Sequence, residues 1–188
     1  APASIIDQKT RAALLLKAES LASAVNYKGA GTVEFIFDPM SKEFFFIEMN
    51  TRIQVEHPVT EVLFGIDLVK AQIEIAQDTT LEAIIHRKYP SGHAIEFRIN
   101  AEDWENDFFP SPGRLSTWKP PKLSGVRIDT AMYEGYSVNP YYDSMIAKMI
   151  VHAKTREEAI HLASDALAHF AVEGVKSTLS FHQQLIYD

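Results

Sequence analysis

Polar side chains alternate with less polar ones between Glu48 and Glu56. The polar positions are Glu48, Asn50, Arg52, Gln54 and Glu56. Because successive side chains of an extended strand point to opposite faces, a strand here would place all five on one face. Two carboxylates, two amides and a guanidinium on one face could hold a divalent cation, an anion and a proton acceptor in a row. An ordinary amphipathic strand with a solvated face would show the same alternation.

The segment before this stretch reads as a β-hairpin. Residues 32–37 are rich in β-branched and aromatic side chains, residues 38–42 contain the turn formers Pro and Ser, and residues 44–47 are apolar again. The pattern predicts a strand, a turn and a return strand.

A hairpin folded about Ser41 would pair Asp38 with Phe44 and Glu34 with Glu48. Like charges directly across a ladder repel each other, and a bound metal ion would remove that repulsion. Ligands that offer only oxygen suit Mg²⁺ or Mn²⁺ and leave room for phosphate oxygens. A register slip of one residue would separate the two carboxylates. One of them could instead be protonated, or both could turn into water.

Bulk composition limits the class of protein. The chain has 188 residues, enough for one large domain or two small ones, and 46% of them are hydrophobic. The net charge is −7 without a block of Lys or Arg, so neither nucleic acid nor an anionic membrane is an expected partner. The absence of cysteine excludes disulfides, thiol catalysis and thiolate metal sites.

The ends of the chain carry no targeting pattern. The sequence has neither a signal peptide nor an apolar run that could span a bilayer, so we expect a cytoplasmic protein. The first four residues, Ala1 to Ser4, lack an initiator Met and lead at once into a helix. We therefore expect the chain to be a piece of a longer protein.

Apolar periodicity predicts helices in the first part of the chain. One runs from Asp7 to about Tyr27, a short turn covers residues 60–64 up to Gly65, and another begins after Asp67 and ends near Gln77. The expected buried positions are Ala13, Leu14, Leu21, Ala24 and Val25 in the first helix and Val69, Ile73 and Ala76 in the last.

The second part of the chain is richer in strands. Expected strands cover residues 93–99, 114–119, 126–132 and 144–153. Thr155 and Glu158 fit a capping box that opens a helix to about Val172, which Gly174 would end. Its expected buried positions are Ala159, Ala163, Ala166, Leu167 and Phe170. Ser177 would cap a last helix to Tyr187.

Three further observations concern candidate sites. Arg98 lies beside Glu96 on the polar side of its strand, where it could form a cross-strand ion pair or hold an anion in its guanidinium fork. Glu56 is a candidate general base, and His57, which precedes a proline, is expected to make a structural hydrogen bond. The segment 29–31 lacks the lysine of a phosphate-binding loop and leads into a strand.

Several segments together resemble one family. The long motif at residues 46–61, Phe-Ile-Glu-Met-Asn-Thr-Arg-Ile-Gln-Val-Glu-His-Pro-Val-Thr-Glu, resembles the signature of biotin carboxylase, an ATP-grasp enzyme. Residues 31–35, 98–103 and 140–145 also resemble this family, and the resemblance covers nearly the whole chain. In Met49 and Pro58 the motif resembles acyl-CoA carboxylases more than pyruvate carboxylase, and this resemblance implies a place in fatty acid metabolism.

The resemblance implies a reaction in which ATP phosphorylates bicarbonate to carboxyphosphate. The CO₂ released from it then carboxylates biotin on a carrier protein. Glu34, Glu48 and Asn50 would bind Mg²⁺ or Mn²⁺, while Gln54 and the backbone N–H of Val55 would orient bicarbonate. Glu56 would accept its proton, Arg98 would hold bicarbonate and then carboxyphosphate, and Arg52 would stabilise the biotin enolate. These roles agree with the chemistry of phosphoryl transfer, which depends on positioning and charge neutralisation.

The resemblance also implies a fold and partners. It implies an α+β fold, in which residues 1–80 form the C-terminal part of an ATP-grasp domain, an antiparallel sheet with packed helices. Residues 81–188 would form the biotin carboxylase C-terminal α/β domain. A biotin carboxyl carrier protein and a carboxyltransferase would be partners, and a homodimer stays open.

The family's chain is longer, and its glycine-rich lid and ATP-binding lysines would precede Ala1. The chain alone is therefore expected to have little or no activity. The sequence is also compatible with two other functions: another ATP-grasp carboxylate ligase, or a non-catalytic scaffold or dimerisation fragment. A ligase of another kind would not need Arg52, Gln54 and Glu56 together.

Overall fold

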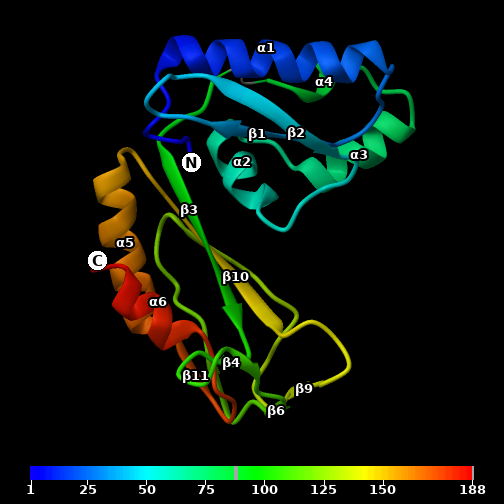
Figure 1. Ribbon diagram of the computed structural model, residues 1–188. Helices are drawn as coiled ribbons and strands as arrows, with labels where there is room; N and C mark the ends of the chain where they lie inside the picture. Colours follow the sequence, from blue (N-terminus) through cyan, green and yellow to red (C-terminus); the bar gives the residue numbers. More distant parts are fainter. Residues whose placement is uncertain (87–88, 188) are drawn as a thin grey trace. The chain divides into compact units, whose positions relative to one another are not determined.

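The computed structural model describes residues 1–86 and 89–187. The chain forms two compact units, Ala1–Pro90 and Ser91–Asp188. Each unit combines α-helices with antiparallel strands (Figure 1). The predicted α+β class is therefore confirmed.

The first unit consists of one hairpin and four helices within its described residues. Its elements are α1 (Gln8–Ala24), β1 (Thr32–Phe37), β2 (Phe44–Asn50), α2 (His57–Phe64), α3 (Leu68–Ala76) and α4 (Leu81–Ile84).

Helix α1 begins where the sequence predicts it. The Asp7 side chain caps it by accepting a hydrogen bond from Thr10 N at 2.8 Å. Its predicted buried face is wrong, because the helix has no buried residue and Leu14 is only half-buried. Leu14, Leu21 and Val25 share one face by their spacing, yet Leu21 and Val25 are exposed, so spacing alone did not decide burial here.

Helix α3 also has the predicted cap, since Lys70 N donates to Asp67 Oδ1 at 2.8 Å. Its buried residue is Ala71, with Ile75 half-buried one turn later. Val69 and Ile73 are 51% and 58% exposed, so their predicted burial is wrong, as is that of Ala76.

Helix α2 begins at His57, three residues before the predicted turn. Pro58 lies in its first turn, where a missing N–H and a fixed φ do no harm. Gly65 closes the helix with a left-handed φ of 65°, as predicted.

The hairpin β1–β2 has two registers. Near the turn Phe37 pairs with Phe44 and Asp38 N donates to Glu43 O, so the predicted pairing of Asp38 with Phe44 is wrong by one residue. A β-bulge between Glu34 and Phe35 then shifts the register by one. Beyond the bulge the pairing is the predicted one.

The second unit is built on a three-stranded sheet and several short strands. Its elements are β3 (His93–Asn100), β4 (Glu102–Asp103), β5 (Phe109–Pro110), β6 (Gly113–Arg114), β7 (Thr117–Lys119), β8 (Val126–Asp129), β9 (Ser137–Val138), β10 (Met145–Ala153), α5 (Arg156–His169), β11 (Ala171–Glu173) and α6 (Leu179–Leu185). The order of the main sheet is β3–β10–β8, and all its pairs are antiparallel.

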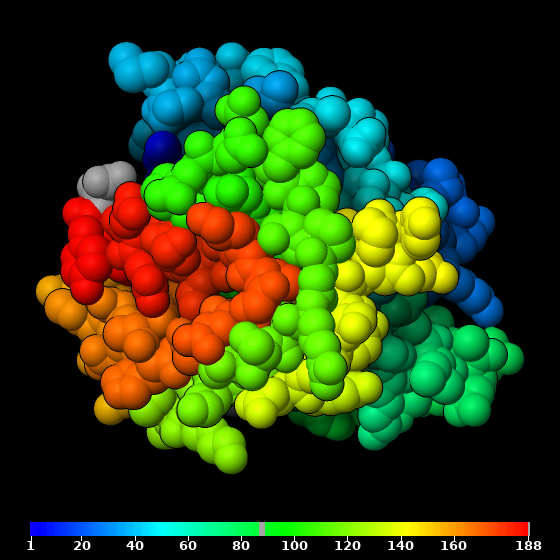
Figure 2. All heavy atoms as spheres, turned by 90° about the horizontal axis from the view of Figure 1, so that it is seen from below, coloured from blue at the N-terminus to red at the C-terminus, as the bar shows by residue number. Residues whose placement is uncertain are grey.

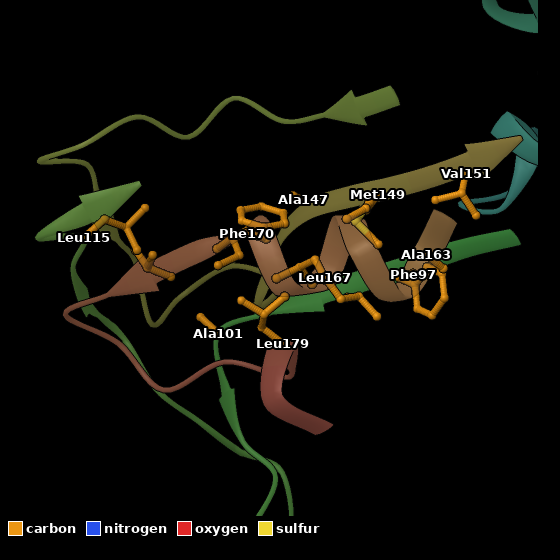
Figure 3. Packing of buried hydrophobic residues seen from close by; sticks show 14 of the residues in the cluster. Phe97, Ala101, Leu115, Ala147, Met149, Val151, Ala163, Leu167, Phe170 and Leu179 are labelled. Carbon is orange, nitrogen blue, oxygen red and sulfur yellow. The ribbon is translucent and has the colours of Figure 1, made fainter. Parts of the chain in front are cut away.

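The core of this unit lies between the sheet and α5. Figure 3 shows Phe97 of β3 and Met149 and Val151 of β10 close to Ala163 and Leu167 of α5. All five positions predicted as the buried face of α5 are buried: Ala159, Ala163, Ala166, Leu167 and Phe170. The predicted capping box of Thr155 and Glu158 is present.

Three predicted boundaries in this unit need correction. Helix α5 ends at His169, and Val172 belongs instead to β11, where it pairs with Trp118. Gly174 follows β11 with a φ of 95°, and a Cβ there would lie 2.1 Å from Arg114 O. The strand predicted at 114–119 is divided into β6 and β7, which pair with the short strands β9 and β11. The strand predicted at 126–132 ends at Asp129, the last residue that pairs with β10.

The last helix is shorter than predicted. It begins at Leu179, with Thr178 rather than Ser177 at the N-cap, and the Thr178 side chain makes no capping bond. Figure 2 shows this red segment at the surface beside the orange α5. None of the helices in residues 1–86 and 89–187 is long and apolar enough to cross a membrane.

We predict that Leu167→Ala destabilises the second unit. Leu167 is 1% exposed, and its truncation should lower the free energy of unfolding by about 2–5 kcal/mol because it leaves a cavity in the core. Urea denaturation measures the change. Leu185→Ala is the matched control, since Leu185 is 49% exposed, and an equal loss in both variants would contradict this packing.

Candidate active site

Two carboxylates face each other across the β1–β2 hairpin. Glu34 and Glu48 are register partners, which confirms the predicted pairing. Between them lies the amide of Asn50, whose Nδ2 donates to Glu34 Oε1 at 2.7 Å and to Glu48 Oε1 at 3.2 Å. One donor shared by two carboxylates reduces the repulsion between them.

The donor set of this cluster fits a hard divalent cation. It offers carboxylate oxygens from Glu34 and Glu48, and a half-turn of the Asn50 amide would add its Oδ1. No group of three or more His, Cys, Asp or Glu side chains suited to a metal occurs in the part of the chain that the structure describes. An ion here would have few protein ligands, which fits a Mg²⁺ or Mn²⁺ ion that also coordinates phosphate oxygens or water.

The single polar strand predicted from Glu48 to Glu56 is wrong beyond Asn50. Asn50 pairs with Thr32, the first residue of β1, so β2 has no partner further along. An unpaired strand leaves its backbone groups unsatisfied, and the chain leaves the sheet at this point.

The segment after β2 nevertheless returns to the carboxylates. Gln54 Nε2 donates to Glu34 Oε1 at 3.1 Å, so Glu34 accepts from both Asn50 and Gln54. The structure therefore brings four of the predicted residues, Glu34, Glu48, Asn50 and Gln54, into one hydrogen-bonded cluster.

His57 and Glu61 hold this segment in place. His57 Nδ1 donates to the backbone oxygen of Gln54 at 2.6 Å, which confirms the predicted hydrogen-bonding role of His57. His57 Nε2 lies 3.8 Å from Glu61 Oε1, and Glu61, 5% exposed, accepts from Leu68 N at 2.8 Å. Sequence reasoning assigned Glu61 no role, although its i,i+4 spacing from His57 on a helix was a usable signal.

A pocket of about 390 Å³ adjoins the cluster. Its polar lining includes Arg52, Gln54 and Glu56, and much of the remainder comes from apolar residues such as Ile75 and Ile84. Gln54 thus belongs both to the carboxylate cluster and to the pocket wall. An anion in the pocket could meet a guanidinium, an amide and a carboxylate from its lining.

The glycine segment at the start of β1 also lines this pocket, and its role is packing. A Cβ on Gly31 would lie 3.0 Å from both Met49 Cε and Tyr27 Cε1. The Tyr27 hydroxyl donates to Ala30 O at 2.7 Å. The close approach of β1 and β2 therefore explains a small residue here without any bound phosphate.

Arg98 belongs to the second unit. It lies on β3, where it pairs with Lys148 of β10, and its side chain is exposed. Its backbone oxygen accepts from Thr178 Oγ1 at 3.1 Å and from His182 Nε2 at 2.9 Å. That Arg98 shares a site with Arg52 and Glu56 stays a prediction.

Two family descriptions match this chain. Residues 1–84 match the carbamoyl-phosphate synthase L chain, ATP binding domain, and residues 96–188 match the biotin carboxylase C-terminal domain.

Individual relatives agree with these matches. Biotin carboxylase 1 of Bacillus subtilis (strain 168) is 49% identical over 185 residues, which are 98% of this chain and 41% of the relative. The crystal structure of a biotin carboxylase–β-γ-ATP complex from Campylobacter jejuni is similar with a TM-score of 0.93 and 42% identity, covering 100% of this chain and 42% of that chain.

A third relative is the biotin carboxylase domain dimer of Hydrogenobacter thermophilus 2-oxoglutarate carboxylase, solved with MgADP, ADP and bicarbonate. Its TM-score is 0.95 at 40% identity, covering 100% of this chain and 41% of that chain. The chain therefore spans about two fifths of the length of these relatives. Two domain matches, close relatives and a shared fold agree throughout: this chain belongs to the biotin carboxylase family.

Proposed function

We propose that this chain supplies the metal-binding and bicarbonate-binding part of a biotin carboxylase, which carboxylates biotin on a carrier protein with ATP and bicarbonate. The observation that carries the proposal is the cluster of Glu34, Glu48 and Asn50, which Gln54 joins to the pocket bordered by Arg52 and Glu56. The relatives that bind an ATP analogue, or MgADP and bicarbonate, support it.

Glu34, Glu48 and Asn50 would hold Mg²⁺ or Mn²⁺. When bound, such an ion neutralises phosphate charge and orients the phosphates for transfer. In this chain Asn50 keeps both carboxylates aimed at one point through its two hydrogen bonds. Gln54 donates a further hydrogen bond to the same oxygen of Glu34, Oε1.

Bicarbonate would bind through Gln54, the backbone N–H of Val55 and Arg98, whose guanidinium fork matches a planar oxyanion. Glu56 would accept the bicarbonate proton, so that the resulting oxyanion can attack the terminal phosphate of ATP. Arg98 would hold the carboxyphosphate formed, and Arg52 would stabilise the biotin enolate as its nitrogen becomes nucleophilic. His57 contributes by fixing the backbone of Gln54.

We also propose the assembly that these roles require. The ATP-grasp part would extend to about residue 80 and the C-terminal domain would begin near residue 81, which is supported by family matches that end at residue 84 and begin at residue 96. A biotin carboxyl carrier and a carboxyltransferase are the expected partners. The dimer described for the Hydrogenobacter relative supports a homodimer. An acyl-CoA carboxylase and a cytoplasmic location stay predictions from the sequence.

Metal binding can be tested without activity. Mn²⁺ should broaden the side-chain amide resonances of Asn50 in the NMR spectrum of this chain. The effect should be absent in the double variant Glu34→Gln, Glu48→Gln, since both charged ligands are lost while the shape is kept. Glu43→Gln, which changes an exposed carboxylate outside the cluster, is the control. Equal broadening in all three proteins would contradict the site.

The role of Glu56 can be tested in the full-length carboxylase. Glu56→Gln should lower bicarbonate-dependent ATP cleavage by about 10²–10⁴-fold, because a general base is lost. The dissociation constant of ATP should change little. Glu82→Gln, on an exposed position of α4, serves as control. An equal loss of ATP affinity would mean that Glu56 is structural.

The chain by itself should show little or no bicarbonate-dependent ATP cleavage. Its sequence lacks a glycine-rich loop with a phosphate-binding lysine, so most of the contacts that would hold the nucleotide are missing. Phosphate release by the purified 188-residue chain, with and without bicarbonate, measures this. Measurable turnover without another polypeptide would refute the prediction.

A further inference from the structure

Strand β3 is an edge strand whose outer side is covered by the end of the chain. It pairs with β10 on one side only, and no other strand of the described residues pairs with it. An uncovered edge leaves N–H and C=O groups without partners. Here Thr178 and His182 of α6 supply such partners, and both bond to the backbone oxygen of Arg98.

Thr178 replaces a neighbouring strand over two residues of β3. Its hydroxyl donates to Arg98 O at 3.1 Å and accepts from Asn100 N at 3.0 Å. Its own N–H donates to Asn100 O at 3.0 Å. Thr178 is 4% exposed, so these bonds are shielded from water and hold the backbone firmly.

His182 adds a second hydrogen bond to the same carbonyl oxygen. Its Nε2 lies 2.9 Å from Arg98 O, and since a carbonyl can only accept, Nε2 carries the proton. The ring packs edge-on against Phe97, with centroids 5.4 Å apart. Its Nδ1 is buried without a hydrogen-bond partner among the described residues.

The surroundings of His182 keep the ring neutral. Burial lowers its pKa below the usual value, and the hydrogen bond to Arg98 O opposes this only in part. A proton on Nδ1 would place an N–H in a buried position where nothing accepts it. The neutral ring with its proton on Nε2 is therefore the form that donates to Arg98.

We propose that Thr178 and His182 are positioning residues for Arg98: they fix its backbone carbonyl so that the guanidinium meets bicarbonate in one orientation. The inference rests on the proposed function of Arg98 as the bicarbonate-binding residue. It adds a role for helix α6. Because a long side chain amplifies small backbone rotations, loss of either bond displaces the guanidinium.

The test compares two substitutions of His182 in the full-length carboxylase. His182→Phe keeps a ring against Phe97 but removes the donor, and the KM for bicarbonate should rise about three- to tenfold, the effect of one hydrogen bond. The KM for ATP should not change. His182→Gln offers an amide N–H with similar reach and should restore the KM for bicarbonate to within about twofold of wild type.

Two controls separate positioning from a general loss of structure. Gln184→Ala alters an exposed residue of the same helix and should leave the KM for bicarbonate unchanged. Thr178→Ser, which keeps the hydroxyl, should act like wild type, whereas Thr178→Val should raise the KM for bicarbonate. If Thr178→Val does not fold, the comparison of His182→Phe with His182→Gln still tests the proposal. Equal KM values for bicarbonate in His182→Phe and wild type would overturn the proposal.

A second measurement is independent of the function proposed for Arg98. In ¹⁵N NMR of this chain at neutral pH, His182 should carry its proton on Nε2, and a proton on Nδ1 would overturn the inference whatever Arg98 does. Conversely, Arg98→Lys should raise the KM for bicarbonate in the full-length enzyme. If it does not while the His182 tautomer is as expected, the assigned role of Arg98 fails and the hydrogen-bond geometry stands.

Discussion

The placement of two like charges on neighbouring strands constrains the β1–β2 hairpin and the segment that follows it. Glu34 and Glu48 face each other only because a β-bulge shifts the register of the hairpin by one residue. Without that bulge the pairing near the turn would continue, and the carboxylates would lie on opposite faces. Asn50 and Gln54 then supply the hydrogen bonds that make the pair tolerable. The bulge therefore creates the pair of carboxylates that is proposed to hold a cation.

Much of this arrangement could be predicted from residue spacing. The pairing of Glu34 with Glu48, the caps Asp67 and Thr155 and the buried face of α5 all depend on local patterns that a sequence shows directly. Such patterns work when one element has a single buried face. Helix α1 has no buried residue, so its predicted burial failed: spacing can place residues on one face, but packing decides whether that face is covered.

The remaining errors concern partners that are distant in the sequence. The alternating polar residues after Asn50 resembled one strand, yet a strand needs a neighbour, and β1 ends its pairing at Thr32. Similarly, Ser177 looked like a helix cap, whereas the neighbouring Thr178 bonds to β3, which lies far earlier in the chain. Local spacing cannot show which hydroxyl or amide will meet a distant backbone group, because tertiary packing decides that.

Each unit contains a histidine that donates a hydrogen bond to the backbone oxygen of a proposed anion-binding residue. Gln54 and Arg98 are both proposed to meet bicarbonate, and each has its backbone oxygen held by a histidine: His57 for Gln54 and His182 for Arg98. In both cases the hydrogen bond acts on the backbone and leaves the functional side chain available for other contacts. An imidazole is well suited to this, since one ring nitrogen donates while the flat ring packs against apolar neighbours, as His182 does against Phe97. The orientation of the proposed anion-binding groups therefore depends on residues that need not touch the anion.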